Sequence, residues 1–192
     1  VLNFSDAVFS IAMTLLVLDI AIPTAKLYEK GFGAAFSDMV PGLIGFLVSF
    51  LVIAMYWVAH LKLTRFLSSL DAKFLYLNIF LLLFVVLLPF STDLYVTGYT
   101  LTGAFVFYSL NLGVIGIFLF FMTRYVYKKE KGKTGFTSLI YHWYQWRGLT
   151  VVAIWLIAAA IAAVLPNTAR MIFLAIFLVN AILDRVYKKR IK

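Results

Sequence analysis

The chain has 192 residues, of which 64% are apolar and 13% are charged. Soluble domains are about half apolar and about a quarter charged, so this composition excludes an ordinary soluble domain, and the shortage of charge also excludes a disordered chain. The absence of cysteine excludes disulfides and thiolate metal sites, while two histidines and eight acidic residues leave little material for any metal centre.

Six apolar stretches are each about as long as a helix needs to cross a bilayer, and continuous apolar runs favour helices over a membrane β-barrel. We therefore expect an all-α polytopic membrane protein with one domain, residues 1–192. The last two stretches are separated by little more than Pro166 and Asn167, which predicts a tight helical hairpin. The expected spans are 1–22, 40–59, 74–90, 98–122, 149–165 and 169–183.

The first stretch lacks the basic start of a signal peptide, and the absence of an initiator Met leads us to expect that the natural chain begins before Val1. The long connection 123–147 carries Tyr and Trp residues at 141–146, which favour the headgroup level, so we expect an interfacial helix there.

Basic residues are distributed unevenly between the two sides. Of the 17 Lys and Arg residues, 14 follow the second, fourth and sixth spans, which predicts that both termini are cytoplasmic. A lipid-headgroup or nucleic-acid role for the basic runs remains an alternative.

The first span contains the densest set of polar groups, which are costly inside a bilayer. Its residues form two bordering helical stripes, a polar one with Asp6, Ser10 and Thr14, and an aliphatic one with Ile11, Leu15 and Leu18. Such a helix is suited to line a narrow pore. Its hydroxyls can coordinate a partly dehydrated cation, and aliphatic side chains arranged around the pore can close it to ions by excluding water. Simple packing of the aliphatic stripe is the alternative.

One segment, 96–100, reads Val-Thr-Gly-Tyr-Thr and is a scrambled version of a potassium-channel filter sequence. The short connection around it leaves no room for a pore helix, so we expect a turn.

Other motifs carry a stronger resemblance. Phe4-Ser5-Asp6 and the residues through Thr14, together with Trp57-Val58-Ala59-His60, Asn78 and Leu88-Pro89-Phe90, resemble the transmembrane protein 175 family, whose signature is R-x-x-x-F-S-D. The signature arginine would come immediately before Val1. Members of this family are potassium channels of animal endosomes and lysosomes, with bacterial and archaeal relatives.

The resemblance implies a single-repeat prokaryotic member that forms a homotetramer in the plasma membrane, with no cofactor, no nucleic-acid partner and no enzyme chemistry. It implies potassium-selective conduction through a pore lined by the first helix, without a filter loop. The constriction carries over onto Ile11, followed by Leu15 and Leu18, and the pore-flanking hydroxyls onto Ser10 and Thr14. A proton-permeable channel of the same family is the alternative, and a secondary transporter is a more distant one.

The family also implies a structural polar network, in which Asp6, Trp57 and His60 hydrogen-bond across the first two helices together with the missing arginine. This network would set the rotation of the first helix. Asp19 would either raise the cation concentration at the pore mouth or be an ordinary interfacial carboxylate. The residues assigned to the network are Phe4, Ser5, Asp6, Trp57, His60 and Asn78.

Overall fold

The computed structural model describes residues 2–18, 20–131, 133–172 and 174–191. Within these residues the regular structure is entirely helical. The helices are α1 (Leu2–Leu15), α2 (Thr24–Lys30), α3 (Phe32–Thr64), α4 (Ala72–Val86), α5 (Leu88–Thr97), α6 (Thr102–Glu130), α7 (Ser138–Ala162), α8 (Pro166–Met171) and α9 (Leu174–Ile191).

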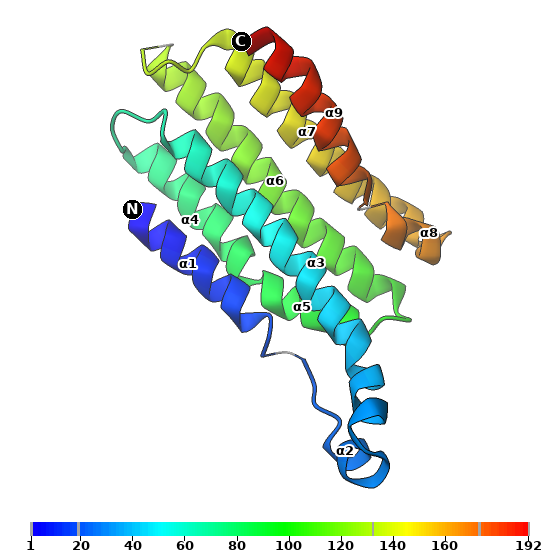
Figure 1. Cartoon of the computed structure of the whole chain (residues 1–192). Coiled ribbons are helices and arrows are strands. Elements are labelled where there is room, and N and C mark those ends of the chain that lie inside the picture. Colours follow the sequence, from blue (N-terminus) through cyan, green and yellow to red (C-terminus); the bar gives the residue numbers. More distant parts are fainter. Residues whose placement is uncertain (1, 19, 132, 173, 192) are drawn as a thin grey trace.

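The long helices form an elongated bundle in which successive passes of the chain alternate in direction (Figure 1). Helix α6 lies in the middle and packs against α3, α4, α5 and α7. Helix α1 lies at one edge of the bundle, against α3 and α4, and α9 lies on α7 at the other edge. The start of α1 and the end of α9 are both directed toward the end of the bundle where α6 finishes (Figure 1).

Four segments of the described residues are long and apolar enough to cross a membrane: Phe32–Thr64, Ala72–Thr97, Thr102–Glu130 and Ser138–Ala162. They contain or overlap the expected spans 40–59, 74–90, 98–122 and 149–165. Helix α3 is the longest, with 33 residues. At 1.5 Å per residue it extends over about 50 Å, more than the hydrocarbon thickness of about 30 Å.

The first expected span, 1–22, is too long, because the helix ends at Leu15 and a turn follows through Leu18. The Leu18 backbone N–H donates to the Leu15 carbonyl at 3.0 Å. Leu16 is the last residue of the buried stripe of α1, and the next two residues are exposed. Helix stability comes largely from tertiary packing, so α1 ends where its packing ends. The sequence pattern predicted that Leu18 continues the helical stripe of Ile11 and Leu15. This prediction is wrong, because Leu18 lies in the turn after the helix.

The expected interfacial helix at 123–147 is also wrong. Residues up to Glu130 continue α6, and from Ser138 onward the aromatic segment forms the first turns of α7. Thr137 caps α7 by accepting from the Ile140 backbone N–H. Residues 138–147 contain neither proline nor glycine, so nothing in them separates an interfacial helix from the apolar span that follows.

Proline explains the boundary between α4 and α5. Pro89 has no backbone N–H, so the hydrogen bond it would donate to residue 85 in a continuous helix is missing. Helix α4 ends at Val86, and α5 begins at Leu88. The two helices continue in the same direction along the bundle (Figure 1).

The expected hairpin near Pro166 is confirmed. Helix α7 ends at Ala162, Pro166 begins the short helix α8, and α9 then returns along α7. The expected span 169–183 is divided between α8 and α9. The predicted turn at the scrambled filter segment is confirmed in part: Val96 and Thr97 end α5, and residues 98–100 form a turn in which the Leu101 backbone N–H donates to the Gly98 carbonyl at 2.8 Å.

The connection between α3 and α4 is tied to the end of α6. Asp71 caps α4 by accepting from the Phe74 backbone N–H at 2.9 Å, and it also accepts from Lys129 Nζ at 2.8 Å and from the Tyr125 hydroxyl. Glu130 accepts from both the backbone N–H and the hydroxyl of Ser68 at 3.0 Å. The Lys129 ammonium, the Tyr125 hydroxyl and the Phe74 N–H hold the pKa of the Asp71 carboxyl well below its usual range.

Candidate functional site

Helix α1 has one buried face, and the position of this face determines which residues of the helix are exposed. The buried positions recur every three or four residues, so they lie on a single side of the helix. This side packs against α3 and α4. Its members are Ser5, Phe9, Ala12 and Leu16.

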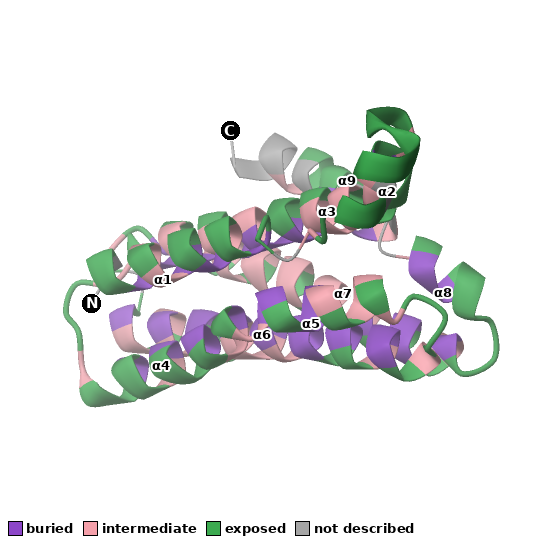
Figure 2. Cartoon of the chain, turned by 90° about the horizontal axis from the view of Figure 1, so that it is seen from below, coloured by how far each residue is buried: buried purple, intermediate pink, exposed green. Residues whose placement is uncertain are grey.

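The opposite face of α1 is exposed and carries the residues assigned to conduction. Ile11 is 57% exposed and Leu15 is 40% exposed, and the side chains of Ser10 and Thr14 are also exposed. Leu18, in the turn after the helix, is 74% exposed. Figure 2 shows α1 with exposed residues on its outward side and buried residues facing the bundle. Hydroxyls and large aliphatic side chains thus share one uncovered surface at the edge of the bundle.

The hydroxyl of Thr14 is oriented by its own helix. It donates to the Ile11 carbonyl at 2.9 Å. Because its proton points at the backbone, its lone pairs face away from that carbonyl. The oxygen is therefore presented as an acceptor, which is the property that a cation ligand requires.

A buried polar chain connects α1 to α4 and α3. Asn78 Nδ2 donates to Ser5 Oγ at 2.9 Å, and Asn78 Oδ1 lies 2.8 Å from His60 Nε2. All three side chains are almost completely buried. Since the amide oxygen can only accept, this amide orientation assigns the proton of neutral His60 to Nε2.

A second contact joins α1 to α3. Trp57 Nε1 donates to Asp6 Oδ1 at 2.9 Å, and the ring of Phe9 lies 5.7 Å from the ring of His60. Asp6, Trp57 and His60 were expected to share one network; Asp6 accepts from Trp57, but the hydrogen-bond partner of His60 is Asn78. Phe4, which it also placed in the network, is 62% exposed and lies outside these contacts.

These contacts restrict the rotation of α1. The adjacent residues Ser5 and Asp6 are bonded to different helices, Ser5 to Asn78 of α4 and Asp6 to Trp57 of α3. Neighbouring residues on a helix point about 100° apart. Turning α1 by one residue would break both bonds, so the network fixes which face of α1 is buried and which is exposed.

Sequence reasoning missed another polar cluster, between α3, α5 and α6. Ser49 Oγ lies 3.0 Å from the Tyr108 hydroxyl and accepts from Thr92 Oγ1 at 3.0 Å, while Asn111 Nδ2 donates to Ser91 Oγ at 3.2 Å. These residues come from segments far apart in the chain, so no local spacing could have revealed them. Their bonds satisfy the buried polar side-chain atoms of this cluster except Asn111 Oδ1, and they hold the three helices together.

The described residues contain no group of three or more His, Asp or Glu side chains that could hold a metal ion. The site is therefore built from hydroxyls, aliphatic side chains and a buried hydrogen-bond network.

Residues 1–89 match the model of a protein family described as endosomal/lysosomal potassium channel TMEM175. A potassium channel of Chamaesiphon minutus is 40% identical over 92 residues, which are 47% of this chain and 45% of that protein. A potassium channel of Streptomyces collinus is 38% identical over 89 residues, 46% of this chain and 43% of that one. The endosomal/lysosomal proton channel TMEM175 of Rattus norvegicus is 30% identical over 97 residues, 50% of this chain and 19% of the rat protein.

The matched segment thus spans less than half of the length of these curated relatives. Over 97% of this chain and 95% of the other, the fold matches a crystal structure described as a lysosomal potassium-selective channel TMEM175 homolog from Chamaesiphon minutus, with a TM-score of 0.78 and 24% identity. Residues 1–89 are thus similar to the TMEM175 family, and the chain has the fold of the TMEM175 homolog over almost its entire length.

Proposed function

We propose that this chain is the subunit of a homotetrameric, potassium-selective channel of a prokaryotic plasma membrane. Residues 1–192 would form one channel domain with six membrane spans and both termini in the cytoplasm. Conduction is passive, with no enzymatic step and no cofactor. The bacterial relatives, which are named potassium channels, support this proposal.

The observation that carries the proposal is the exposed face of α1, on which Ser10 and Thr14 border Ile11 and Leu15. Polar groups in a membrane usually face protein or water rather than lipid. Since α1 lies at the edge of the bundle, several copies of the chain are needed to enclose this face.

Four copies of α1 would make a narrow pore. With neighbouring helix axes ~8–10 Å apart, each axis lies ~6–7 Å from the centre of a four-helix ring. A helix with side chains has a radius of ~5–6 Å, so its side chains nearly close the centre. Ile11 is the proposed constriction, Leu15 narrows the pore one turn farther along, and Leu18 lies in the turn beyond.

The hydroxyl oxygens of Thr14 and Ser10 are the proposed ligands of a partly dehydrated potassium ion. The orientation of the Thr14 hydroxyl, with its proton on the Ile11 carbonyl, supports an acceptor role. A hydroxyl ring coordinates an ion more weakly than stacked carbonyl rings, so we expect modest selectivity.

The distribution of charge supports cytoplasmic termini. Lys62 in the last turn of α3, and Lys128 and Lys129 in the last turn of α6, lie at the end of the bundle toward which α9 runs. Basic residues are enriched on the cytoplasmic side of membrane proteins. The α1 start and the α9 end share this side.

A second candidate is a proton-permeable channel, which the names of the rodent relatives favour. A secondary transporter is a third, although transporters typically have internal repeats and broken helices around a midplane site. These functions differ in measurable ways: a proton-permeable channel shifts its reversal potential with a pH gradient, and a transporter gives saturable coupled exchange without unitary currents.

The test is single-channel recording of the purified full chain in planar bilayers, with potassium on one side and sodium on the other. We expect unitary currents and a reversal potential displaced in the direction that favours potassium. The absence of unitary currents would refute potassium-selective conduction, as would a reversal potential that follows an added pH gradient instead of the potassium gradient.

A further inference from the structure

A cavity of about 320 Å³ lies between α3, α6, α7 and α9, on a different side of the bundle from the exposed face of α1. Small-molecule sites are typically about 300–1,000 Å³ and largely apolar with a few polar groups. The cavity is therefore large enough for one slender ligand.

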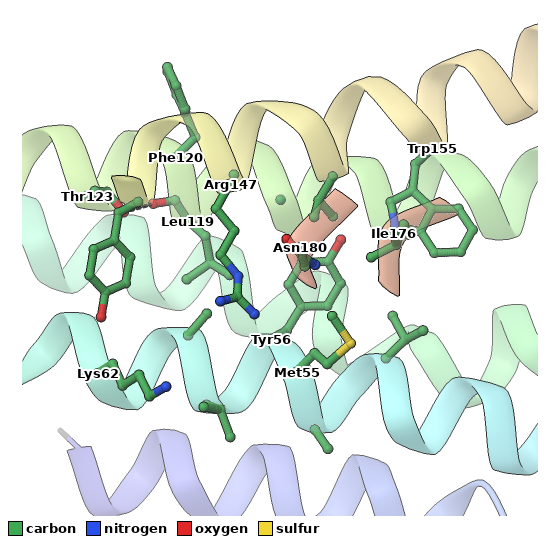
Figure 3. Close-up of a pocket in the computed structure, with 18 of the residues that line it drawn as sticks. Met55, Tyr56, Lys62, Leu119, Phe120, Thr123, Arg147, Trp155, Ile176 and Asn180 are labelled. Carbon is green, nitrogen blue, oxygen red and sulfur yellow. Dashed lines mark hydrogen bonds between the residues drawn. The ribbon is translucent and has the colours of Figure 1, made fainter. Parts of the chain in front are cut away.

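Most of the cavity wall is apolar. Figure 3 shows Met55 of α3, Leu119 of α6 and Ile176 of α9 around the same space. Two hydroxyls in the wall are already used by the backbone: Tyr56 donates to the Leu112 carbonyl and Thr123 to the Leu119 carbonyl, both at 2.8 Å. This part of the cavity suits a hydrocarbon chain.

One end of the cavity is cationic. Lys62, in the last turn of α3, and Arg147, in the first half of α7, both line it. The Arg147 guanidinium lies 5.5 Å from the Trp143 ring centre, which helps to hold it in place. Basic pockets between membrane helices are a recurrent way to bind anionic lipid headgroups.

Asn180 provides an independent sign of a polar ligand. Its side chain is 6% exposed and lines the cavity, and neither its amide nitrogen nor its amide oxygen has a hydrogen-bond partner among the described residues. In Figure 3 the amide lies between Arg147 and Ile176. A buried amide without partners is costly, so a bound group that pairs with it would be favoured.

We propose that this cavity binds one acyl chain of an anionic phospholipid. The sequence of chemical groups along it matches such a molecule: cations for the phosphate, a buried amide donor for the ester carbonyl, and an apolar section for the hydrocarbon. Arg147 and Lys62 neutralise the headgroup, Asn180 Nδ2 donates to the ester, and the chain extends past Met55 toward Ile176. This site goes beyond the proposed conduction and does not depend on it.

Native mass spectrometry of the delipidated full chain tests the proposal by titration with phosphatidylglycerol or phosphatidylcholine of equal chain length. We expect phosphatidylglycerol to be retained at least tenfold more strongly.

Three variants locate the site. Arg147→Gln should remove the preference for phosphatidylglycerol, and Ala59→Leu should weaken binding by filling the cavity. Arg124→Gln removes the same charge from an exposed position on α6 that does not line the cavity, so its binding should match the wild type. Circular dichroism confirms that each variant is folded.

Equal retention of the two lipids would overturn the proposal, as would an equal loss of binding in Arg147→Gln and Arg124→Gln. Tight binding of a free fatty acid together with weak binding of phosphatidylglycerol would also overturn it, because the occupant would then lack a phosphate.

Discussion

Ile11 and Thr14 are three residues apart on α1 and are joined by a hydrogen bond between the Thr14 hydroxyl and the Ile11 carbonyl. One residue contributes bulk and the other contributes an oxygen to the same exposed face. Because adjacent turns of one helix carry these two properties, their effects on conduction can be separated by single substitutions.

Ile11→Asn should raise unitary conductance severalfold and reduce the preference for potassium over sodium. The change keeps a side chain of similar length but replaces a dewetting surface with one that holds water. Single-channel recording measures both quantities. Val17→Asn, at an exposed position outside the helical stripe, is the control and should leave both unchanged. Unaltered current in Ile11→Asn would mean that Ile11 does not line the narrowest part of the pore.

Thr14→Val should reduce the potassium-to-sodium permeability ratio while leaving a measurable current. Valine keeps the shape of threonine and removes only the hydroxyl, so a change in ion preference would come from the lost oxygen. The reversal potential under bi-ionic conditions reports this ratio. Thr64→Val is a matched control, since its hydroxyl bonds the Leu61 carbonyl at the far end of α3. If Thr14→Val kept the wild-type ratio, the ion would not be coordinated there.

At the scale of elements, the position of α1 depends on two neighbouring side chains that bind two different helices. The Ser5–Asn78–His60 chain holds α1 to α4, and the Trp57–Asp6 bond holds it to α3. Ser5 lies on the buried face of α1 and Asp6 lies two turns before Thr14, so we expect these bonds to influence conduction through the orientation of the helix.

Asn78→Leu and Asp6→Ala should therefore reduce the recovery of tetramers in detergent before they change ion preference. Each leaves a buried or half-buried partner unsatisfied, at a cost of about 1–3 kcal/mol. Size-exclusion chromatography measures the recovery. Asn111→Leu breaks a buried bond to Ser91 on α5 that does not involve α1, so it should lower thermal stability with a smaller effect on assembly. Intact tetramers with shifted selectivity would instead place Asp6 in the conduction path.

The connection between α3 and α4 makes stability depend on pH through Asp71. The pKa of this carboxyl is lowered by Lys129, Tyr125 and the Phe74 N–H. A lowered pKa gives stability that is present above the unfolded value of about 3.9 and is lost as the pH falls toward the folded value. Asp71→Asn should thus lower the melting temperature by a few degrees at pH 7, and the difference should shrink below about pH 4.

Thermal unfolding in detergent at several pH values measures this difference. Glu29→Gln, at an exposed position on α2, is the control. A constant difference between wild type and Asp71→Asn from pH 7 to pH 3 would show that the carboxylate charge does not stabilise this connection.

The sequence predicted most helices because long apolar runs have few alternatives inside a bilayer. It predicted the end of α1 wrongly, since apolar residues continue past Leu16 and only the loss of packing ends the helix. The sequence also predicted that residues 138–147 are separate from α7. Tyr and Trp favour the membrane interface both on a short interfacial helix and on the first turns of a long spanning helix, so their presence does not distinguish the two. The partner of His60 could not be predicted, because Asn78 reaches it through the packing of α4 against α1.

At the scale of the whole molecule, the last turns of α3 and α6, which carry Lys62, Lys128 and Lys129, lie at the end of the bundle where α1 starts and α9 finishes. The same end carries the 65–71 and 131–137 connections, while α2 and the turn at 98–101 lie toward the other end (Figure 1). If the positive-inside rule holds for this chain, the end of the bundle with these basic residues faces the cytoplasm.

The orientation can be tested directly, because the chain has no cysteine and a single introduced thiol is unambiguous. Lys133→Cys lies in the α6–α7 connection and Glu29→Cys lies on α2, and both side chains are exposed. The positive-inside rule places residue 133 in the cytoplasm and residue 29 outside. In intact cells a membrane-impermeant maleimide should label Glu29→Cys and not Lys133→Cys, and after permeabilisation it should label both. The reverse pattern would show that the bundle has the opposite orientation. Labelling of both positions in intact cells would show that residues 29 and 133 lie on the same side of the membrane.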